Sequence, residues 1–243
     1  MGVKLKNSPI VEVICEFKFK DSSEDLTIYG DFHNEIGKEY IKKKPRSYQE
    51  VIINKSESGI EHNIKEYRLQ QFFSDDEKTL IQIGSNILAI NRLKPYQTWE
   101  EFLPVIKKAY SSYIKIAKLK DIKTISLKYI NKINFKKEQI DFDDYFLFKP
   151  EFNEKLGTID GRFILGSEFR RNKDNDLLRI TLANTSPFKG FKVAFLLDLE
   201  YSTIKLDNIN ISNTLKWVKN AHTEIETAFF NCLTDNLIGK LKK

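Results

Sequence analysis

The segment PIVEVICEFKF, residues 9–19, decides the fold. Its apolar residues fall at alternate positions: Val11, Val13, Cys15, Phe17 and Phe19. Charged residues occupy positions between them: Glu12, Glu16 and Lys18. Such alternation predicts a β-strand with one face in a core. Because an antiparallel sheet commonly buries one face and leaves the other to water, the segment favours an antiparallel sheet.

A second segment, LKYINKINF at residues 127–135, has the same alternation and carries Lys128 and Lys132 on its polar face. We interpret the two strands as equivalents in an internal duplication. The order strand, crossover, meander and helix would then occur twice, in halves 1–120 and 121–243 of a single compact domain. The predicted fold class is α+β, with two antiparallel sheets related by a pseudo-twofold axis that can curl into a barrel-like shared sheet.

The elements of the first half are expected as a strand at 10–20, a helix over 26–40, a meander of four strands up to ILAINR, and a helix that begins at Thr98. Thr98 and Glu101 have the spacing of a capping box. The second half is expected to contain a strand at 122–135, an irregular or partly helical segment at 140–158, strands at 159–169, 177–184 and 191–201, and one long helix over 213–240.

Composition narrows the class of protein. The chain has 243 residues, 41% of them hydrophobic, which is enough for a sizeable core. A net charge of +6 arises from 40 basic and 34 acidic residues in mixed clusters. This charge is compatible with binding of nucleic acid but does not favour it. Two cysteines without metal-ligand spacing indicate reduced thiols and a cytoplasmic location. No apolar run approaches the ~20 residues of a membrane span, so no membrane association is expected.

Charged residues on the predicted sheet form a candidate ligand-binding polar face: Glu12, Glu16, Lys18, Arg68, Lys128, Arg179, Asp198 and Glu200. Carboxylates can hold a divalent metal and cations can hold phosphate, so the face could bind a small anionic ligand. The first strand is similar to that of the triphosphate tunnel enzymes, which carry Glu-any-Glu-any-Lys, but Ile14 stands where a Glu is needed. Solvated cross-strand ion pairs are the alternative.

Two further groups of residues are candidates for function. The loop NRLKPYQTW offers Arg92, Lys94, Tyr96 and Trp99 to an anionic or aromatic partner, unless Trp99 packs inward. His222 falls on the apolar stripe of the last helix and is expected to be a structural, hydrogen-bonded histidine. The sequence has no glycine-rich phosphate loop, legible nucleophile or metal-ligand cluster, so neither a cofactor nor a bound metal is expected.

Four segments carry a family resemblance: SPIVEVICEFKF, QQFFSDDEKTLIQIGSNILAINRLKPYQTWEEF, ISLKYINKI and AHTEIETAFFNCL. Together they resemble a sporadically distributed, uncharacterised prokaryotic protein family of about this length. The likeness covers nearly the whole chain. It implies an accessory gene of the kind found in antiviral defence or toxin–antitoxin loci, and it assigns no catalytic residue.

The leading hypothesis is a non-enzymatic binding module that acts with a protein partner, because aromatic residues are abundant and the meander can accept a partner strand. A homodimer is a further expectation. The first alternative is a metal-dependent phosphohydrolase that acts on a nucleotide or polyphosphate through the polar face. The second is weak binding of nucleic acid through Arg92, Lys94 and the basic segment KKKPR at residues 42–46.

Overall fold

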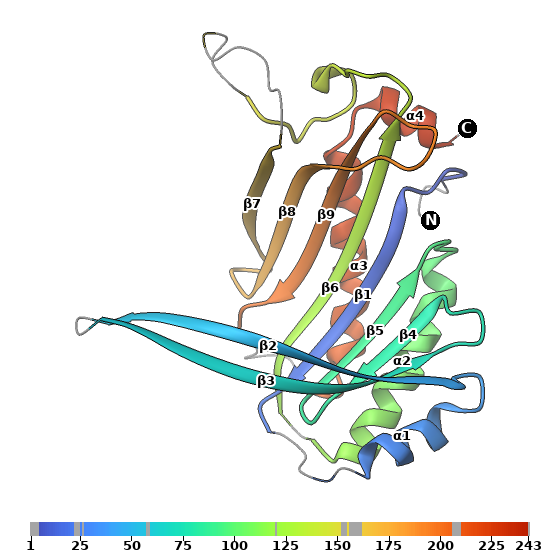
Figure 1. The fold of residues 1–243 in the computed structure, drawn as a ribbon, viewed down its shortest axis with the longest axis vertical. Helices are drawn as coiled ribbons and strands as arrows, with labels where there is room; N and C mark the ends of the chain where they lie inside the picture. Colours follow the sequence, from blue (N-terminus) through green and yellow to red (C-terminus); the bar gives the residue numbers. More distant parts are fainter. Residues whose placement is uncertain are drawn as a thin grey trace. The chain divides into compact units, whose positions relative to one another are not determined.

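The fold is built on one large antiparallel sheet (Figure 1). A computed structural model describes residues 5–21, 25, 27–56, 59–119, 121–151, 155, 162–205 and 210–242. Its strands are β1 (Ile10–Phe19), β2 (Lys42–Ser56), β3 (Gly59–Phe73), β4 (Thr79–Ile83), β5 (Ile87–Leu93), β6 (Ile122–Phe135), β7 (Ile164–Arg171), β8 (Asp176–Thr185) and β9 (Val193–Thr203). Its helices are α1 (Ile28–Ile36), α2 (Trp99–Ala117), α3 (Thr214–Asn231) and α4 (Asp235–Lys242), with a 3₁₀ turn at Phe142–Asp144.

The nine strands follow the order β2-β3-β4-β5-β1-β6-β9-β8-β7. This corrects the expectation of two sheets and a barrel-like closure: there is one sheet, and it is open, with β2 and β7 as its edges. The reason is that β1 and β6, the first strands of the two expected halves, are neighbours in the strand order, so their backbones pair and the sheet continues through them. The duplication and its pseudo-twofold axis are not shown.

The chain divides into two compact units. Unit 1 contains Met1–Cys15, Lys94–Gln97 and Thr124–Lys243, and unit 2 contains Glu16–Leu93 and Thr98–Lys123. These limits differ from the expected halves because β1 and β6 each contribute residues to both units.

Unit 2 packs α1 and α2 on the apolar face of its strands. Aromatic pairs join the strands to α2, with ring centroids 4.7 Å apart for Phe17 and Tyr110 and 5.6 Å apart for Phe19 and Tyr113. The predicted capping residue of α2 is confirmed, since the Thr98 side chain accepts a hydrogen bond from the Glu101 amide. Every residue of β4 is buried, so this strand is covered on both faces.

The β2–β3 hairpin of unit 2 is much longer than the strands beside it. Its two strands pair from Lys42 with Phe73 to Ser56 with Gly59, whereas β3 pairs with β4 only over residues 70–73. Most of this ribbon therefore has only its own two strands as pairing partners in the part of the chain that the structure describes.

Unit 1 packs α3 against one face of its strands, as the ribbon shows (Figure 1). The predicted alternation is confirmed on β6, where Leu127, Tyr129, Asn131 and Ile133 are buried and Lys128, Ile130 and Lys132 are half-exposed. The expectation of one helix over 213–240 is wrong. The Thr234 hydroxyl accepts a hydrogen bond from the Leu237 amide, which starts α4 as a separate helix after Asn231.

Candidate binding face

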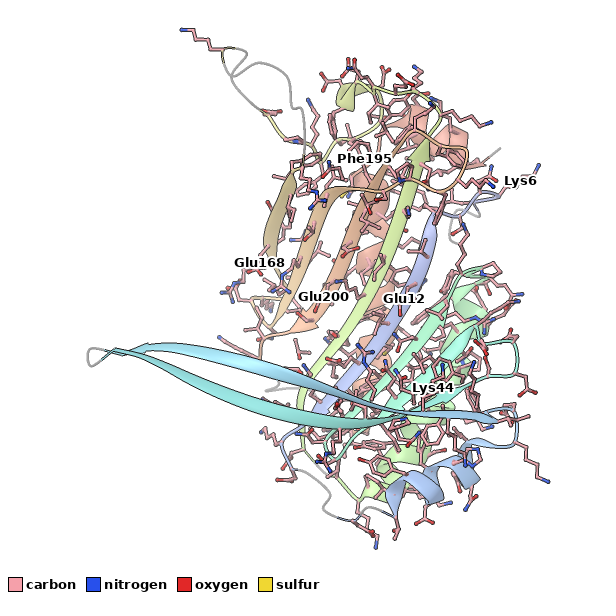
Figure 2. All side chains as sticks on the ribbon, in the orientation of Figure 1. Lys6, Glu12, Lys44, Glu168, Phe195 and Glu200 are labelled. Carbon is pink, nitrogen blue, oxygen red and sulfur yellow. The ribbon has the colours of Figure 1, made fainter. Side chains whose placement is uncertain are left out.

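The face of unit 1 opposite α3 carries polar side chains that are half-exposed or exposed; we call it the open face. Strand register builds one row of charge across it, because Glu168 on β7 lies opposite Arg179 on β8, Arg179 opposite Glu200 on β9, and Glu200 opposite Lys128 on β6. The labels in Figure 2 mark Glu168 and Glu200 on this row. Charges thus alternate in sign from strand to strand.

These charges are paired with one another. The Arg179 guanidinium donates to Glu168 Oε1 from Nη2 at 2.7 Å and from Nε at 2.9 Å, and its Nη1 lies 3.5 Å from Glu200 Oε2. The hydrogen bond to Glu168 raises the pKa of Arg179. Lys128 Nζ lies 3.3 Å from Asp198 Oδ2, on the neighbouring strand. Half-exposed pairs of this kind contribute at most about 1 kcal/mol each.

One carboxylate oxygen of Asp198 takes no part in these ion pairs. Its Oδ1 is shielded from solvent and has no hydrogen-bond partner among the described residues. Thr181 lies directly opposite Asp198 on β8. A shielded carboxylate oxygen without a donor is uncommon in folded proteins, so this atom is an acceptor that the described residues leave unsatisfied.

The predicted polar-face residues are divided between the two units. Lys128, Arg179, Asp198 and Glu200 lie together on unit 1, and Glu12 lies on β1 of the same unit (Figure 2). In unit 2, Lys18 pairs with Glu16 at 3.3 Å, and Arg68 is an exposed residue of β3. Glu168 was missed, because nothing in the sequence alone fixes which residue of β7 faces Arg179.

The four residues of the predicted partner loop point to different neighbours. Arg92 Nη1 donates to Thr79 Oγ1 at 2.6 Å, and the Trp99 ring packs edge-on against Phe102 within α2. Lys94 lies with its ammonium 4.6 Å from the centre of the Phe188 ring. Tyr96 turns toward Tyr129.

Tyr96, Tyr129 and His222 form a short polar chain inside unit 1. The Tyr96 and Tyr129 hydroxyls lie 3.2 Å apart, and the Tyr129 hydroxyl lies 3.0 Å from His222 Nδ1. Burial raises the pKa of Tyr129 well above its ordinary value, so its phenol stays protonated. When His222 carries its proton on Nε2, Tyr129 donates to Nδ1 and Tyr96 donates to Tyr129. The chain gives the buried Tyr129 hydroxyl two hydrogen-bond partners, Tyr96 and His222, which are both half-buried.

Within the described residues, no group of three or more His, Cys, Asp or Glu side chains is arranged to hold a metal ion. Among the helices that the structure describes, none is both long and apolar enough to cross a membrane. No model of a known protein family and no curated protein matches this sequence. The resemblance drawn from the four quoted segments therefore remains a prediction.

Proposed function

We propose that the protein is a non-enzymatic binding module that holds a partner protein by adding an extended segment of that partner to β7. The observation that carries this proposal is the edge position of β7, which ends the strand order and pairs with β8 over its whole length of eight residues. An edge strand offers one unpaired row of backbone donors and acceptors, and strand addition uses that row for affinity.

The sequence of β7 lacks lysine and proline, the residue types most typical of a protected edge, although it carries the charges of Glu168, Arg170 and Arg171. Proteins discourage edge pairing with proline and lysine, and β2, the other edge, begins with Lys42, Lys43 and Lys44 followed by Pro45. By contrast, β7 reads ILGSEFRR and contains neither residue type. Its side chains are exposed or half-exposed throughout. The contrast favours β7 as the edge kept accessible for a partner.

The side chains of β7 also indicate which residues a partner strand would carry. Ile164 is 79% exposed, more than any other large apolar side chain that the structure describes. Arg170 is exposed on the same face and makes no ion pair with a described residue. A complementary strand would carry an apolar residue near Ile164 and a carboxylate near Arg170. An accessory role in a defence or toxin–antitoxin locus would supply such a partner from a neighbouring gene.

The test compares two variants that each add two positive charges to unit 1. Ile164→Lys with Gly166→Lys protects the edge, and a Cβ at Gly166 meets only Thr181 Oγ1 at 3.8 Å, so the change fits. Asn220→Lys with Thr227→Lys changes exposed positions of α3 and serves as the control. We expect copurification from the native host to recover the partner with the wild type and the control, and not with the edge variant.

Hydrogen exchange gives the direct readout. Partner binding by strand addition should slow the exchange of backbone amides in residues 164–171, because the partner's carbonyls accept from them. Protection elsewhere with no change in β7 would refute the proposal. If the slowed amides appear on raising the concentration of the protein alone, and the edge variant abolishes the effect, the partner strand is β7 of a second copy and the module is a homodimer.

The phosphohydrolase alternative draws its support from Asp198 Oδ1, the carboxylate oxygen without a donor. It is the weaker proposal, because Arg179 and Lys128 neutralise the carboxylates around it. Magnesium or manganese with triphosphate should raise the melting temperature if a metal–phosphate complex binds there. An unchanged melting temperature at millimolar ligand would remove this alternative.

A further inference from the structure

Unit 1 contains a group of three lysines and two exposed phenylalanines. We call it the lysine–phenylalanine cluster, and its members are Lys94, Lys132, Phe188, Lys189 and Phe191. The residues come from the loop after β5, from β6 and from the turn between β8 and β9. None of them belongs to the β7 edge.

The backbone holds the cluster in place. The Lys94 amide donates to the Val11 carbonyl at 3.0 Å, and the Lys132 amide donates to the Pro9 carbonyl at 2.8 Å. The Phe188 amide donates to Asn134 Oδ1 at 2.9 Å, which fixes the β8–β9 turn to β6.

That turn presents both aromatic rings. The Phe191 amide donates to the Phe188 carbonyl at 3.0 Å, and Gly190 between them has φ of 87°. A positive φ at the third position is typical of a type II turn, where glycine is favoured. Phe188 is 37% exposed and Phe191 is 36% exposed. Two phenylalanine side chains are therefore accessible within one turn.

Two ammonium groups share the ring of Phe188. Lys132 Nζ lies 3.9 Å and Lys94 Nζ 4.6 Å from the ring centre. Neither makes an ion pair with a described residue, whereas nearby Lys192 pairs with Glu138 at 3.2 Å. Two like charges over one ring repel each other, and an anion between them would relieve that repulsion.

We propose that the lysine–phenylalanine cluster binds single-stranded nucleic acid. A phosphate would draw the ammonium groups of Lys94 and Lys132 toward itself, because a charge-assisted contact to phosphate is stronger than an exposed cation–π contact. The movement uncovers the Phe188 ring, and bases then stack on Phe188 and Phe191. Alternation of cations with aromatic rings is the usual arrangement for strands bound without sequence preference. The net charge of +6 assists the encounter.

The site differs from the nucleic-acid hypothesis drawn from sequence. That hypothesis relied on Arg92 and the segment 42–46, but Arg92 is bonded to Thr79, and Lys42 forms an ion pair with Glu77. Of its residues, only Lys94 belongs to the cluster.

The experiment is a fluorescence anisotropy titration with a labelled oligothymidylate of about 12 nucleotides, within the site sizes known for single-strand binders. We expect Lys94→Ala with Lys132→Ala to weaken binding at least about tenfold. The same variant should lower the slope of log affinity against log salt by about 1.4, which is about 0.7 for each lost phosphate contact on a single strand.

Substitutions of the aromatic residues test the contribution of base stacking separately from that of charge. Phe191→Ala should weaken binding about tenfold with an unchanged salt slope, because stacking on one ring contributes about 1–3 kcal/mol per base. Phe188→Trp should retain or improve the affinity, since the larger ring still stacks. Lys216→Ala with Lys219→Ala removes the same charge from exposed positions of α3 and should change affinity less than about twofold.

Three outcomes would overturn the proposal. The first is no binding by the wild type at low salt. The second is an equal loss of affinity in the α3 control, which would show that net charge alone acts. The third is that vesicles of anionic lipid bind with the same dependence on Phe188 and Phe191 while the oligonucleotide does not, which would make the cluster a membrane contact. Melting temperatures of all variants verify that each one folds.

Discussion

The sheet carries different polar side chains in its two units. The comparison is between β4 and β5 of unit 2 and β8 and β9 of unit 1. In unit 2 both faces of β4 are buried, and a row of neutral amides crosses the sheet there: Gln71, Gln82 and Asn91. In unit 1 one face stays half-exposed, and a row of charged residues crosses it. The difference in burial explains the difference in chemistry.

The amides of unit 2 bond to one another, and Arg46 Nη1 adds a longer hydrogen bond to Gln82 Oε1 at 3.3 Å. Gln71 Nε2 donates to Gln82 Oε1 at 2.8 Å, and Gln82 Nε2 donates to Asn91 Oδ1 at 3.0 Å. An amide both donates and accepts, so a row of amides can be buried without burying charge. Ions in the same place would lose their hydration, which costs several kcal/mol each. A polar residue on a sheet therefore does not by itself indicate a binding site. Its burial and its hydrogen-bond partners show whether it has a structural role.

The exception to this division is Asp176, a carboxylate that is only 2% exposed in unit 1. It accepts from Trp217 Nε1 at 3.0 Å, the Tyr201 hydroxyl at 3.1 Å and Asn172 Nδ2 at 2.9 Å. We expect Asp176→Ala to lower the free energy of unfolding by about 3 kcal/mol, because buried donors lose a charged acceptor. Urea denaturation measures the change.

Asp75→Ala removes an exposed carboxylate from the β3–β4 turn and should change stability by less than about 0.5 kcal/mol. A small effect of Asp176→Ala would mean that unit 1 tolerates unpaired donors where unit 2 does not, and the comparison would fail.

Gln82 is the central residue of the amide chain. Gln82→Ala should lower the free energy of unfolding by about 2 kcal/mol, since it leaves the Gln71 donor and the Asn91 acceptor without this partner. Gln82→Leu restores the volume but not the hydrogen bonds. Stability equal to wild type in the leucine variant, measured by thermal and urea unfolding, would show that the amide chain contributes nothing.

Alkaline pH tests the buried phenols of both units. Burial raises the pKa of Tyr40 from its ordinary value of 10 to about 12, and burial likewise raises the pKa of Tyr201. Above pH 10 the unfolded chain loses protons that the folded chain keeps, so stability falls as pH rises toward 12. We expect about 1 kcal/mol of loss per phenol between pH 10 and 11.

Urea denaturation at a series of pH values measures this loss, and Tyr40→Phe should remove one phenol's share of it. If the variant kept the full pH dependence, the proton would come from another group and Tyr40 would titrate as it does in water.

The smallest effect is expected at Lys128 and Asp198, whose side chains are 31% and 26% exposed. A double-mutant cycle of Lys128→Met and Asp198→Asn should give a coupling of about 0.5 kcal/mol, as for other half-exposed ion pairs. A coupling well above 1 kcal/mol that persists in high salt would indicate an enclosed face and would favour a ligand site at Asp198 Oδ1.

The local features of the fold could be predicted from the sequence, because they depend on neighbouring residues. Alternation located β1 and β6, and the spacing of Thr98 and Glu101 located the start of α2. Strand order could not be predicted, since it depends on which distant strands pair. The break before α4 was missed because a threonine within a helical pattern gives a weak signal until its hydroxyl is seen to cap Leu237.

The candidate surfaces were less predictable than the strands. Lys128, Arg179, Asp198 and Glu200 were identified as polar-face residues, but which charge meets which is a matter of register. The lysine–phenylalanine cluster combines three separate segments, so only the tertiary fold reveals that Lys94 and Lys132 share a ring.

The division of β1 and β6 between the two units limits how this protein could be cut or rearranged. A single break after residue 120 would give one fragment that carries residues 1–15 and 94–97 of unit 1, and another that carries residues 121–123 of unit 2. Each fragment would hold strand residues that the other needs. Two genes that encode these fragments would therefore have to be expressed together for both units to be complete.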